Sequence, residues 1–358
     1  MGKTSVTQAI AASLALAGPS HHSVKSYNNH IGVPLTLARM PRGTERAVFE
    51  IGMNHAEEIR PLTKMVQPHV AVVTTVGPAH IENFPDGQIG VARAKAEIFD
   101  GLHPGGVAIL NADNAWYELL REAALANGAI IETFGRAADC TAQLLAFEGG
   151  SGSAIVRASL RGRPIDIPLA QTGAHWGPNA LATLLAAEAL GAPLDSALHA
   201  LAGLQALAGR GAETTVRLPS GTITLIDESY NANPISMRAA LDTLGARETT
   251  GRRIAVLTDM LELGAASTHE HIALAEPILA AKVDQVFLAG PEMKALNDAL
   301  PAALRGGWRD TTAALAPIVV AALQNGDVVV IKGSNGSKAS LVVDSIKAAV
   351  VDGPGENR

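Results

Sequence analysis

The sequence predicts an α/β protein with two domains, each built around a mostly parallel sheet. Short apolar runs rich in β-branched residues recur along the chain, and segments of helical composition separate them. Strands that are apolar throughout are typical of parallel sheets covered by helices on both faces. The chain has 358 residues, 47% of them hydrophobic and 17% charged, so it can form two or three domains with large cores.

The first half of the chain contains three predicted strands, at residues 47–51, 70–76 and 107–110. Gly52 ends the first run and Gly77-Pro78 ends the second, and both are typical turn signals. The segment 91–99, between the last two strands, contains Ala, Arg, Lys and Glu and predicts a helix. This alternation predicts strand-helix-strand units.

Residues 154–160 and 165–168 differ from these strands, because they flank the turn signal Arg161-Gly162-Arg163-Pro164. Two β-rich runs joined by a glycine turn predict a hairpin, which we place as an antiparallel patch at the sheet edge. An Ala- and Leu-rich stretch at 178–208 then predicts helices, interrupted at Gly191-Ala192-Pro193.

The second half begins at a domain boundary that we place near Gly209-Arg210-Gly211, which gives domains at 1–208 and 209–358. Strands are predicted beyond it at 222–226, 253–257, 284–288 and 328–331. Helices are predicted at about 234–245, 269–281, 312–324 and 338–349. The regular alternation predicts a second doubly wound domain of the Rossmann-like kind.

Composition excludes several classes of protein. The net charge is −6 with no long run of Lys or Arg, which argues against nucleic-acid binding. No stretch of about 18 apolar residues is present, so we expect no membrane insertion. Cys140 is the single cysteine, which rules out an internal disulfide and fits a reducing compartment. We therefore expect a cytoplasmic protein.

The stretch Gly2-Lys3-Thr4-Ser5 has the form of the end of a phosphate-binding P-loop. In that interpretation a helix follows, its N-terminus and Lys3 bind phosphates, and the Thr4 hydroxyl ligates Mg²⁺. The same residues, with the apolar run 9–18, also have the outline of a secretory signal, although Ser13 interrupts that run. A four-residue match also arises by chance, so other residues must decide between these interpretations.

Polar residues follow the predicted strands at the sheet edge where parallel sheets bind their ligands. Glu50 ends the first strand, His80 follows the second, and Lys95 lies on the next helix. Glu50 is a natural Mg²⁺ ligand and His80 a softer one, and each has the alternative role of a satisfied structural residue. Lys95 would face solvent or repel cations, unless carbamylation by CO₂ inverted its charge.

Six segments in order resemble motifs of the Mur ligase family. They are Ser26–Leu37, Glu50–His55, Thr75–His80, Ala92–Ile98, Asp227–Pro234 and Asp259–Gly264. Each motif is short, but their shared order from residue 2 to about residue 340 makes the resemblance specific. The last two are similar to motifs of the member that adds D-alanyl-D-alanine to UDP-N-acetylmuramoyl-tripeptide in peptidoglycan synthesis.

The resemblance implies a P-loop-type first domain and ATP-dependent amide-bond formation through an acyl phosphate, with two Mg²⁺ ions. The residues implied to be catalytic are Lys3, Glu50, His80 and Lys95, with Lys95 carbamylated. The implied metal ligands are Thr4, Glu50, His80 and Lys95. Those implied to bind the nucleotide are Gly2, Lys3, Thr4, Ser5, Asn179, Arg210, Asp227, Tyr230 and Asn231. Those implied to bind the two peptide substrates are Asn28, Asn29, Lys332 and Ser334. We expect a monomer.

Three alternatives stay open. The motif Tyr230–Pro234 has a purely structural interpretation, in which Asn233 caps a helix that begins at Pro234. Another ligase of the superfamily, of the folyl or cyanophycin type, fits the P-loop but not the last two motifs. The third alternative is a truncated, catalytically impaired fragment or a non-catalytic binding module.

The third alternative depends on what precedes Gly2 in the family. An N-terminal domain, a strand and a glycine-rich turn stand there in the family and have no counterpart in this sequence. That strand is central in the family's sheet, so without it we expect weak ATP binding, weak binding of the sugar nucleotide and exposed apolar sheet edges.

Overall fold

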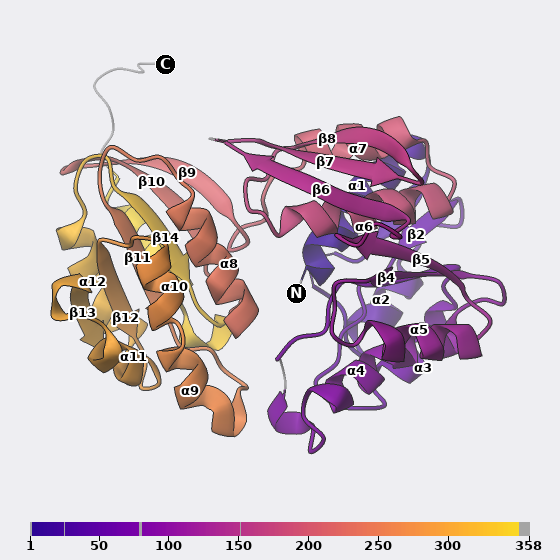
Figure 1. Ribbon diagram of the computed structural model, residues 1–358, viewed down its shortest axis with the longest axis horizontal. Helices are drawn as coiled ribbons and strands as arrows, with labels where there is room; N and C mark the ends of the chain where they lie inside the picture. The colour runs from indigo at the N-terminus through magenta and orange to yellow at the C-terminus, as the bar shows by residue number, and fades with distance from the viewer. Residues whose placement is uncertain (1, 25, 79–80, 151, 351–358) are drawn as a thin grey trace. The chain divides into compact units, whose positions relative to one another are not determined.

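The computed structural model describes residues 2–24, 26–78, 81–150 and 152–350 (Figure 1). The chain divides into two compact units, Met1–Leu204 (unit 1) and Gln205–Arg358 (unit 2). Each unit contains a six-stranded, mostly parallel sheet with helices packed on it, which confirms the predicted α/β class.

The large sheet of unit 1 has the strand order β3-β4-β5-β6-β7-β8. Its strands are β3 (Val70–Val73), β4 (Val107–Asn111), β5 (Ile130–Gly135), β6 (Ala142–Gly149), β7 (Ala154–Leu160) and β8 (Arg163–Leu169). Neighbours from β3 to β6 pair in parallel, and β6, β7 and β8 are antiparallel. The predicted hairpin is confirmed as β7 and β8, whose turn places Arg161 and Gly162 at φ 51° and 80°. The sequence analysis did not predict β5 and β6.

A separate two-stranded sheet in unit 1 pairs β1 (Ser20–His22) in parallel with β2 (Arg46–Val48). β2 is shorter than the predicted run, because the Glu50 amide donates to the Ser23 hydroxyl rather than to a strand carbonyl. Among the described residues, β2 pairs only with β1, and the outer edge of β3 has no partner strand. The expected apolar edges without partner strands are therefore present among the described residues, and Ala47 and Val72 on them are half-buried.

The helices of unit 1 are α1 (Lys3–Ala17), α2 (Gly32–Ala38), α3 (Ile59–Val66), α4 (Gln88–Ala96), α5 (Tyr117–Ala126), α6 (Trp176–Ala189) and α7 (Leu194–Gly203). α1 contributes Ala9, Ile10 and Leu14 to a core that it shares with α6 and α7. This burial is what the P-loop interpretation of the N-terminal residues predicts, since the helix then packs on the sheet. The predicted break between α6 and α7 is present, with Gly191 at φ 69°.

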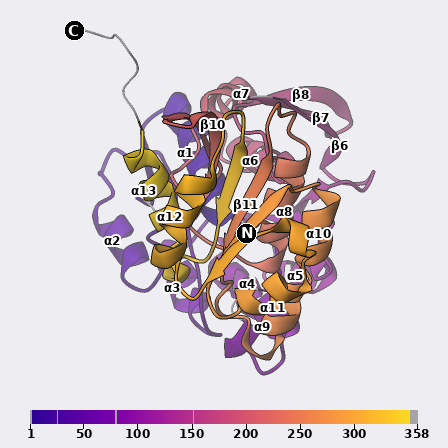
Figure 2. The same ribbon diagram turned by 90° about the vertical axis from the view of Figure 1, so that its left-hand side faces the viewer.

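Unit 2 has the strand order β13-β12-β11-β14-β10-β9. The strands are β9 (Ala212–Leu218), β10 (Gly221–Glu228), β11 (Arg253–Thr258), β12 (Gln285–Ala289), β13 (Arg305–Arg309) and β14 (Val328–Lys332). β9 pairs antiparallel with β10, and the other pairs are parallel. Two hydrophobic cores, one containing residues of α8, α10 and α11 and one containing residues of α12 and α13, fit the expected doubly wound arrangement (Figure 2).

The helices of unit 2 are α8 (Pro234–Gly245), α9 (Ser267–Ile272), α10 (Ala275–Ala280), α11 (Met293–Ala299), α12 (Thr312–Ala322) and α13 (Ser340–Ala348). The single helix predicted at 269–281 is two helices, because Pro277 has no N–H to donate to the carbonyl of Ala273. The sequence analysis also missed β9, β13 and α11. In the part of the chain that the structure describes, no helix combines the length and the apolar character that crossing a membrane requires.

The start of α8 bears out the structural interpretation of the Tyr230–Pro234 motif. The Asn233 side chain accepts from the Ser236 amide at 2.9 Å, and the Ser236 hydroxyl accepts from the Asn233 amide at 2.9 Å. Pro234 occupies the first helical position. This reciprocal capping box fixes where the chain leaves β10 and enters α8.

Candidate active site

The first turn of α1 and the first turn of α6 meet at two of the predicted nucleotide-binding residues. Gly2 precedes α1 with φ 80°, a conformation that a side chain disfavours. A Cβ on Gly2 would also lie 2.7 Å from Oδ1 of Asn179, so a glycine is required there on two grounds. No side chain caps the start of α1, so the amides of its first turn lack the partner that a capping side chain would supply.

Thr4 lies inside this first turn and is 3% exposed. Its hydroxyl is 3.1 Å from the hydroxyl of Ser26, a residue that the sequence analysis placed in a motif but not in the site. The pair joins α1 to the loop after β1. Ser26 is recognised as a residue of the site by its contact with the Thr4 hydroxyl. This contact forms only when the chain folds, so the sequence alone does not indicate it.

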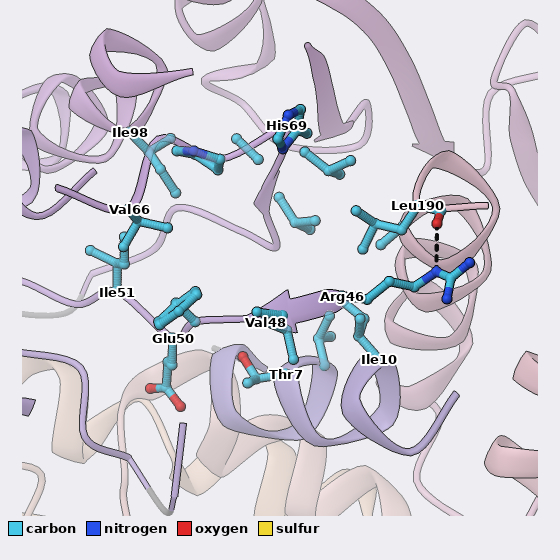
Figure 3. Close-up of a pocket in the computed structure, with 18 of the residues that line it drawn as sticks. Thr7, Ile10, Arg46, Val48, Glu50, Ile51, Val66, His69, Ile98 and Leu190 are labelled. Carbon is cyan, nitrogen blue, oxygen red and sulfur yellow. Dashed lines mark hydrogen bonds between the residues drawn. The ribbon is translucent and has the colours of Figure 1, made fainter. Parts of the chain in front are cut away.

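Glu50 is 3% exposed and follows β2, where Figure 3 shows its carboxylate beyond the strand end. Oε1 accepts a hydrogen bond of 2.7 Å from the Asn28 amide nitrogen. Oε2 is buried and has no hydrogen-bond partner among the described residues. A buried carboxylate oxygen with no donor is costly, so it calls for a bound cation or another donor.

Asn28 and Asn29 were both predicted to face the peptide substrate. The Asn28 side chain donates a hydrogen bond to Glu50 and so orients its carboxylate. The Asn29 side-chain oxygen accepts from the amides of Ile31 and Gly32 at 3.2 and 3.0 Å, so it organises the start of α2. Both side chains therefore have local partners within unit 1.

Lys95 lies on α4 and is half-buried. Desolvation and, to a smaller degree, the charge of Lys3 lower its pKa to about 7. Lys3 and Lys95 are therefore close enough to repel each other, although 92 positions separate them (95 − 3). His80, the other predicted metal ligand, lies outside the described residues, and within them no group of three His, Cys, Asp or Glu side chains gathers around a metal position.

The predicted nucleotide residues of unit 2 cluster at the end of β10. The Asp227 carboxylate accepts from the Gly209 amide at 3.1 Å and from the Ser229 amide and hydroxyl at 3.1 and 2.6 Å. The Arg210 guanidinium lies 4.2 Å from the centre of the Tyr230 ring. Asp227 thereby fixes the two loops that present Arg210 and Tyr230.

Lys332 ends β14 and is only 2% exposed. Its ammonium donates to Oε2 of Glu228 at 3.2 Å and to the carbonyl of Asn231 at 2.9 Å. Ser334 is 5% exposed, and its hydroxyl accepts from the Leu261 amide at 3.0 Å. Glu228, which the sequence analysis did not select, is thus the partner that allows a lysine to be buried here.

Comparison with known proteins identifies the fold and the family. A model of the Mur ligase middle domain matches residues 1–187, and one of the Mur ligase glutamate ligase domain matches residues 214–335. The chain belongs to the Mur ligase family. This Mur ligase is 33% identical to UDP-N-acetylmuramoyl-tripeptide–D-alanyl-D-alanine ligase of Escherichia coli K12 over 347 residues, which cover 97% of the chain and 75% of the relative. The same-named protein of Haemophilus influenzae is also 33% identical, over 352 residues.

Solved structures agree with these relatives. MurF from Acinetobacter baumannii superposes on this Mur ligase with a TM-score of 0.86 and 28% identity, covering 97% of the chain and 75% of that structure. MurF of Thermotoga maritima, solved in complex with ADP, has a TM-score of 0.83 at 22% identity and supports the fold.

Proposed function

We propose that this Mur ligase joins D-alanyl-D-alanine to UDP-N-acetylmuramoyl-tripeptide at the expense of ATP, in peptidoglycan synthesis. The relatives that carry this name align along 97% of the chain. The observation that carries the proposal is the arrangement at the start of α1. An uncapped helix N-terminus, a buried threonine hydroxyl and a carboxylate oxygen without a donor are the groups that a Mg²⁺-nucleotide requires.

The reaction needs activation because a carboxylate has no good leaving group. A carboxylate oxygen of the tripeptide attacks the γ-phosphorus of ATP, the bond to the β–γ bridging oxygen breaks, and ADP leaves. The amine of D-alanyl-D-alanine then attacks the acyl phosphate, phosphate leaves, and a proton passes to solvent. Positioning and charge neutralisation supply most of the catalysis in such phosphoryl transfers.

In this proposal the residues of unit 1 hold the phosphates and the metal. The amides at the start of α1 and the Lys3 ammonium neutralise the charge on the phosphoryl oxygens. Thr4 and Glu50 would ligate Mg²⁺, with His80 as a further ligand. Bound Mg²⁺ would withdraw charge from the phosphoryl oxygens and orient them for in-line attack.

Carbamylation of Lys95 belongs to the same proposal. An amine whose pKa is about 7 is about half neutral at pH 7 and mostly neutral at pH 8, and only a neutral amine reacts with CO₂. The reaction forms a carbamate and releases a proton, which turns a cation close to Lys3 into an anion. Such an anion offers oxygen ligands to a metal ion.

The remaining predicted residues bind the organic parts of the substrates. Asn179 contacts the adenine, and Arg210, Asp227, Tyr230 and Asn231 form the nucleotide-facing surface of the domain that we place at 209–358. Asn28 and Asn29 face the muramyl-peptide, and Lys332 and Ser334 lie near the incoming dipeptide, where their buried hydrogen bonds give them an organising role.

The split sheet of unit 1 favours a second candidate function, binding of the nucleotide and the peptide without turnover. A P-loop that is incompletely supported would hold phosphate weakly. The test is phosphate release by the purified chain with Mg-ATP, the muramyl-tripeptide nucleotide and D-alanyl-D-alanine. Release that requires all three substrates supports the ligase. Binding of ATP without release favours the second candidate, and no binding of any substrate contradicts both.

A further inference from the structure

The loop that follows β14, residues 333–338, lies at the carboxyl end of an inner strand of unit 2. β14 lies between β10 and β11 in the sheet (Figure 1). α13, which follows this loop, contributes to one hydrophobic core, whereas α8, which follows β10, contributes to the other. Sheets of this kind bind their ligands at the strand ends where neighbouring connections pass to opposite faces. The loop is therefore well placed to meet a small ligand.

Ser334, in this loop, has a hydroxyl proton that no described residue accepts. The Ser334 hydroxyl accepts from the Leu261 amide at 3.0 Å, and the Ser334 amide donates to the Asp259 carbonyl at 3.2 Å. A serine hydroxyl can donate one hydrogen bond as well as accept. Among the described residues, the hydrogen bonds of Ser334 leave that proton unused, although the residue is only 5% exposed. A ligand oxygen would accept it.

Thr258, the last residue of β11, holds this loop through Ser337. The hydroxyl oxygens of Thr258 and Ser337 are 2.6 Å apart, and the Ser337 hydroxyl donates to the Ser334 carbonyl at 2.6 Å. Because Ser337 has one hydroxyl proton and gives it to Ser334, Thr258 must be the donor in its pair with Ser337. The two hydrogen bonds therefore run in one direction, from Thr258 through Ser337 to Ser334.

The close fit of Thr258 against Gly333 makes these bonds possible. Leu257 pairs with Lys332 in the parallel register, so Thr258 and Gly333 come next on the two strands. A Cβ on Gly333 would lie 1.6 Å from the Thr258 hydroxyl oxygen, so the hydroxyl occupies the space that a side chain at 333 would fill. Thr258 is fully buried. It therefore reaches Ser337 from within the sheet rather than from the surface.

The loop is also held from the opposite side, at the start of α12. The Thr312 hydroxyl donates to the Ser337 carbonyl at 2.6 Å. Ser337 is thus fixed by side chains of β11 and of α12, which are far apart in the sequence. Loss of the Thr258 hydroxyl would loosen one side of the loop and leave the other side attached.

We propose that Thr258 is a positioning residue for the incoming dipeptide. Through Ser337 it holds the Ser334 hydroxyl so that its unused proton is donated to a carbonyl or carboxylate oxygen of D-alanyl-D-alanine. The acceptor is an oxygen, because the amino end of the dipeptide is a cation in solution and has only protons to give. This role rests on the proposed ligase function, which supplies the identity of the dipeptide. Thr258 itself is buried and acts only through the loop.

The test compares Thr258→Val, which keeps the branched shape and removes the hydroxyl, with Thr258→Ser, which keeps the hydroxyl. Calorimetric titration of the full chain with D-alanyl-D-alanine, in the presence of a non-hydrolysable ATP analogue and the muramyl-tripeptide nucleotide, measures dipeptide affinity without turnover. We expect Thr258→Val to weaken dipeptide binding about tenfold, the effect of one hydrogen bond that is no longer held in place. Thr258→Ser should restore most of the affinity, and the affinity for the ATP analogue should stay unchanged in both variants.

The matched control is Thr243→Val on α8. The half-buried Thr243 donates one hydrogen bond of 2.8 Å to the Ala239 carbonyl, so this variant loses a similar bond elsewhere in unit 2 and should keep its dipeptide affinity. Ser337→Ala interrupts the same two bonds from the other end and should weaken dipeptide binding as Thr258→Val does. It keeps the role testable if Thr258→Val does not fold.

A double-variant comparison separates positioning from general stability. Ser334→Ala should weaken dipeptide binding at least as much as Thr258→Val, and combining the two should add little, because both act on one hydrogen bond. Unchanged affinity in Thr258→Val and Ser337→Ala, additive losses, or equal losses for the dipeptide and the ATP analogue would overturn the role. Dipeptide binding that depends on Thr258 without any phosphate release would support the role and contradict only the ligase function. A chain that binds no dipeptide would overturn both.

Discussion

The two units of this chain differ in whether the polar groups at their strand ends have hydrogen-bond or ion-pair partners. In unit 2, Asp227 accepts three hydrogen bonds and the buried Lys332 ammonium is paired with Glu228. In unit 1, one oxygen of Glu50 has no described partner, and the pKa of Lys95 is lowered to about 7 by burial and by Lys3. The sheet of unit 2 is continuous, whereas unit 1 has two separate sheets.

The polar groups of unit 2 form a surface that is ordered before any ligand binds. Those of unit 1 form a site whose charges are balanced only when ligands bind. The groups of unit 2 are held in place before anything binds, so they can position a substrate at little further cost. The groups of unit 1 carry unbalanced charge in a desolvated place, and phosphate, metal ion and CO₂ are the species that would balance it. Unit 1 is therefore where ligands should change stability most.

The first prediction concerns Lys95 and has the largest expected effect. We expect Lys95→Ala to reduce phosphate release by about 10³-fold or more, because the proposed metal ligand and its charge are lost together. Acetate or propionate should restore part of the activity by entering the space that the carbamate leaves. Wild-type activity at limiting CO₂ should rise as pH increases through about 7, since the neutral amine is the form that reacts.

The matched control for Lys95→Ala is Arg93→Ala on the same helix. Arg93 is exposed and pairs with the exposed Asp86, so its loss should leave activity nearly unchanged. A Lys95→Ala variant with full activity, or one that no small acid rescues, would remove carbamylation from the proposed mechanism. A ¹³C signal of a carbamate in labelled bicarbonate, present at pH 8 and absent from the variant, is the direct observation.

The second prediction tests whether the buried contacts of Lys332 hold the polar groups of unit 2 in place without a ligand. Lys332→Met leaves the Glu228 carboxylate and the Asn231 carbonyl without their shared donor, and we expect a loss of about 3–5 kcal/mol in the free energy of unfolding. The double variant with Glu228→Leu should lose less, because no unpaired charge then stays behind. Urea unfolding followed at the amides of β14 measures both.

Lys294→Ala is the surface control for this prediction. Lys294 pairs with Asp298 one helical turn away, and both side chains are about half exposed, so we expect no measurable change. If Lys332→Met costs no more than Lys294→Ala, the interior of unit 2 is not held by this lysine and the contrast between the units fails.

Much of the fold could be predicted from short-range patterns. β14, Val328–Lys332, is apolar except for its last residue, and its neighbours β10 and β11 contain the mostly apolar runs 222–226 and 253–257 that predicted them. β13 was missed because Arg305–Arg309 contains two glycines, a tryptophan and two arginines, and becomes a strand only by pairing with β12. The division of 269–281 into two helices follows from Pro277, a residue that disfavours a continuous helix.

The site was predictable where a motif carried the chemistry and unpredictable where distant partners complete it. Glu50 could be selected from its place at a strand end, but its two unequal oxygens depend on Asn28, 22 positions earlier. Lys332 was expected near a substrate, and its burial against Glu228 could not be predicted, because these residues are 104 positions apart. Contacts of that kind are set by packing rather than by local sequence.

The third prediction compares how much the N-terminal caps of two helices contribute to stability. α8 begins in a capping box, whereas no side chain caps α1. We expect Asn233→Ala to cost about 1 kcal/mol and to speed hydrogen exchange in the first turn of α8. Thr311→Ala at the start of α12 should cost less, since Thr311 accepts a single bond of 3.3 Å. Equal losses at the two caps would contradict the role given to the reciprocal pair.

The fourth prediction, with the smallest effect, uses the buried acid of unit 2. Burial raises the pKa of Asp259 above its ordinary value, although the Met293 amide and His271 oppose the shift. The folded chain then holds this proton more tightly than the unfolded chain, so Asp259 contributes stability below its unfolded pKa of about 4 and loses it as pH rises through the folded value. Asp259→Asn should therefore raise the melting temperature slightly at pH 7 and leave it unchanged near pH 3. The opposite dependence would show that Asp259 is stabilised as an anion, by the Met293 amide and His271.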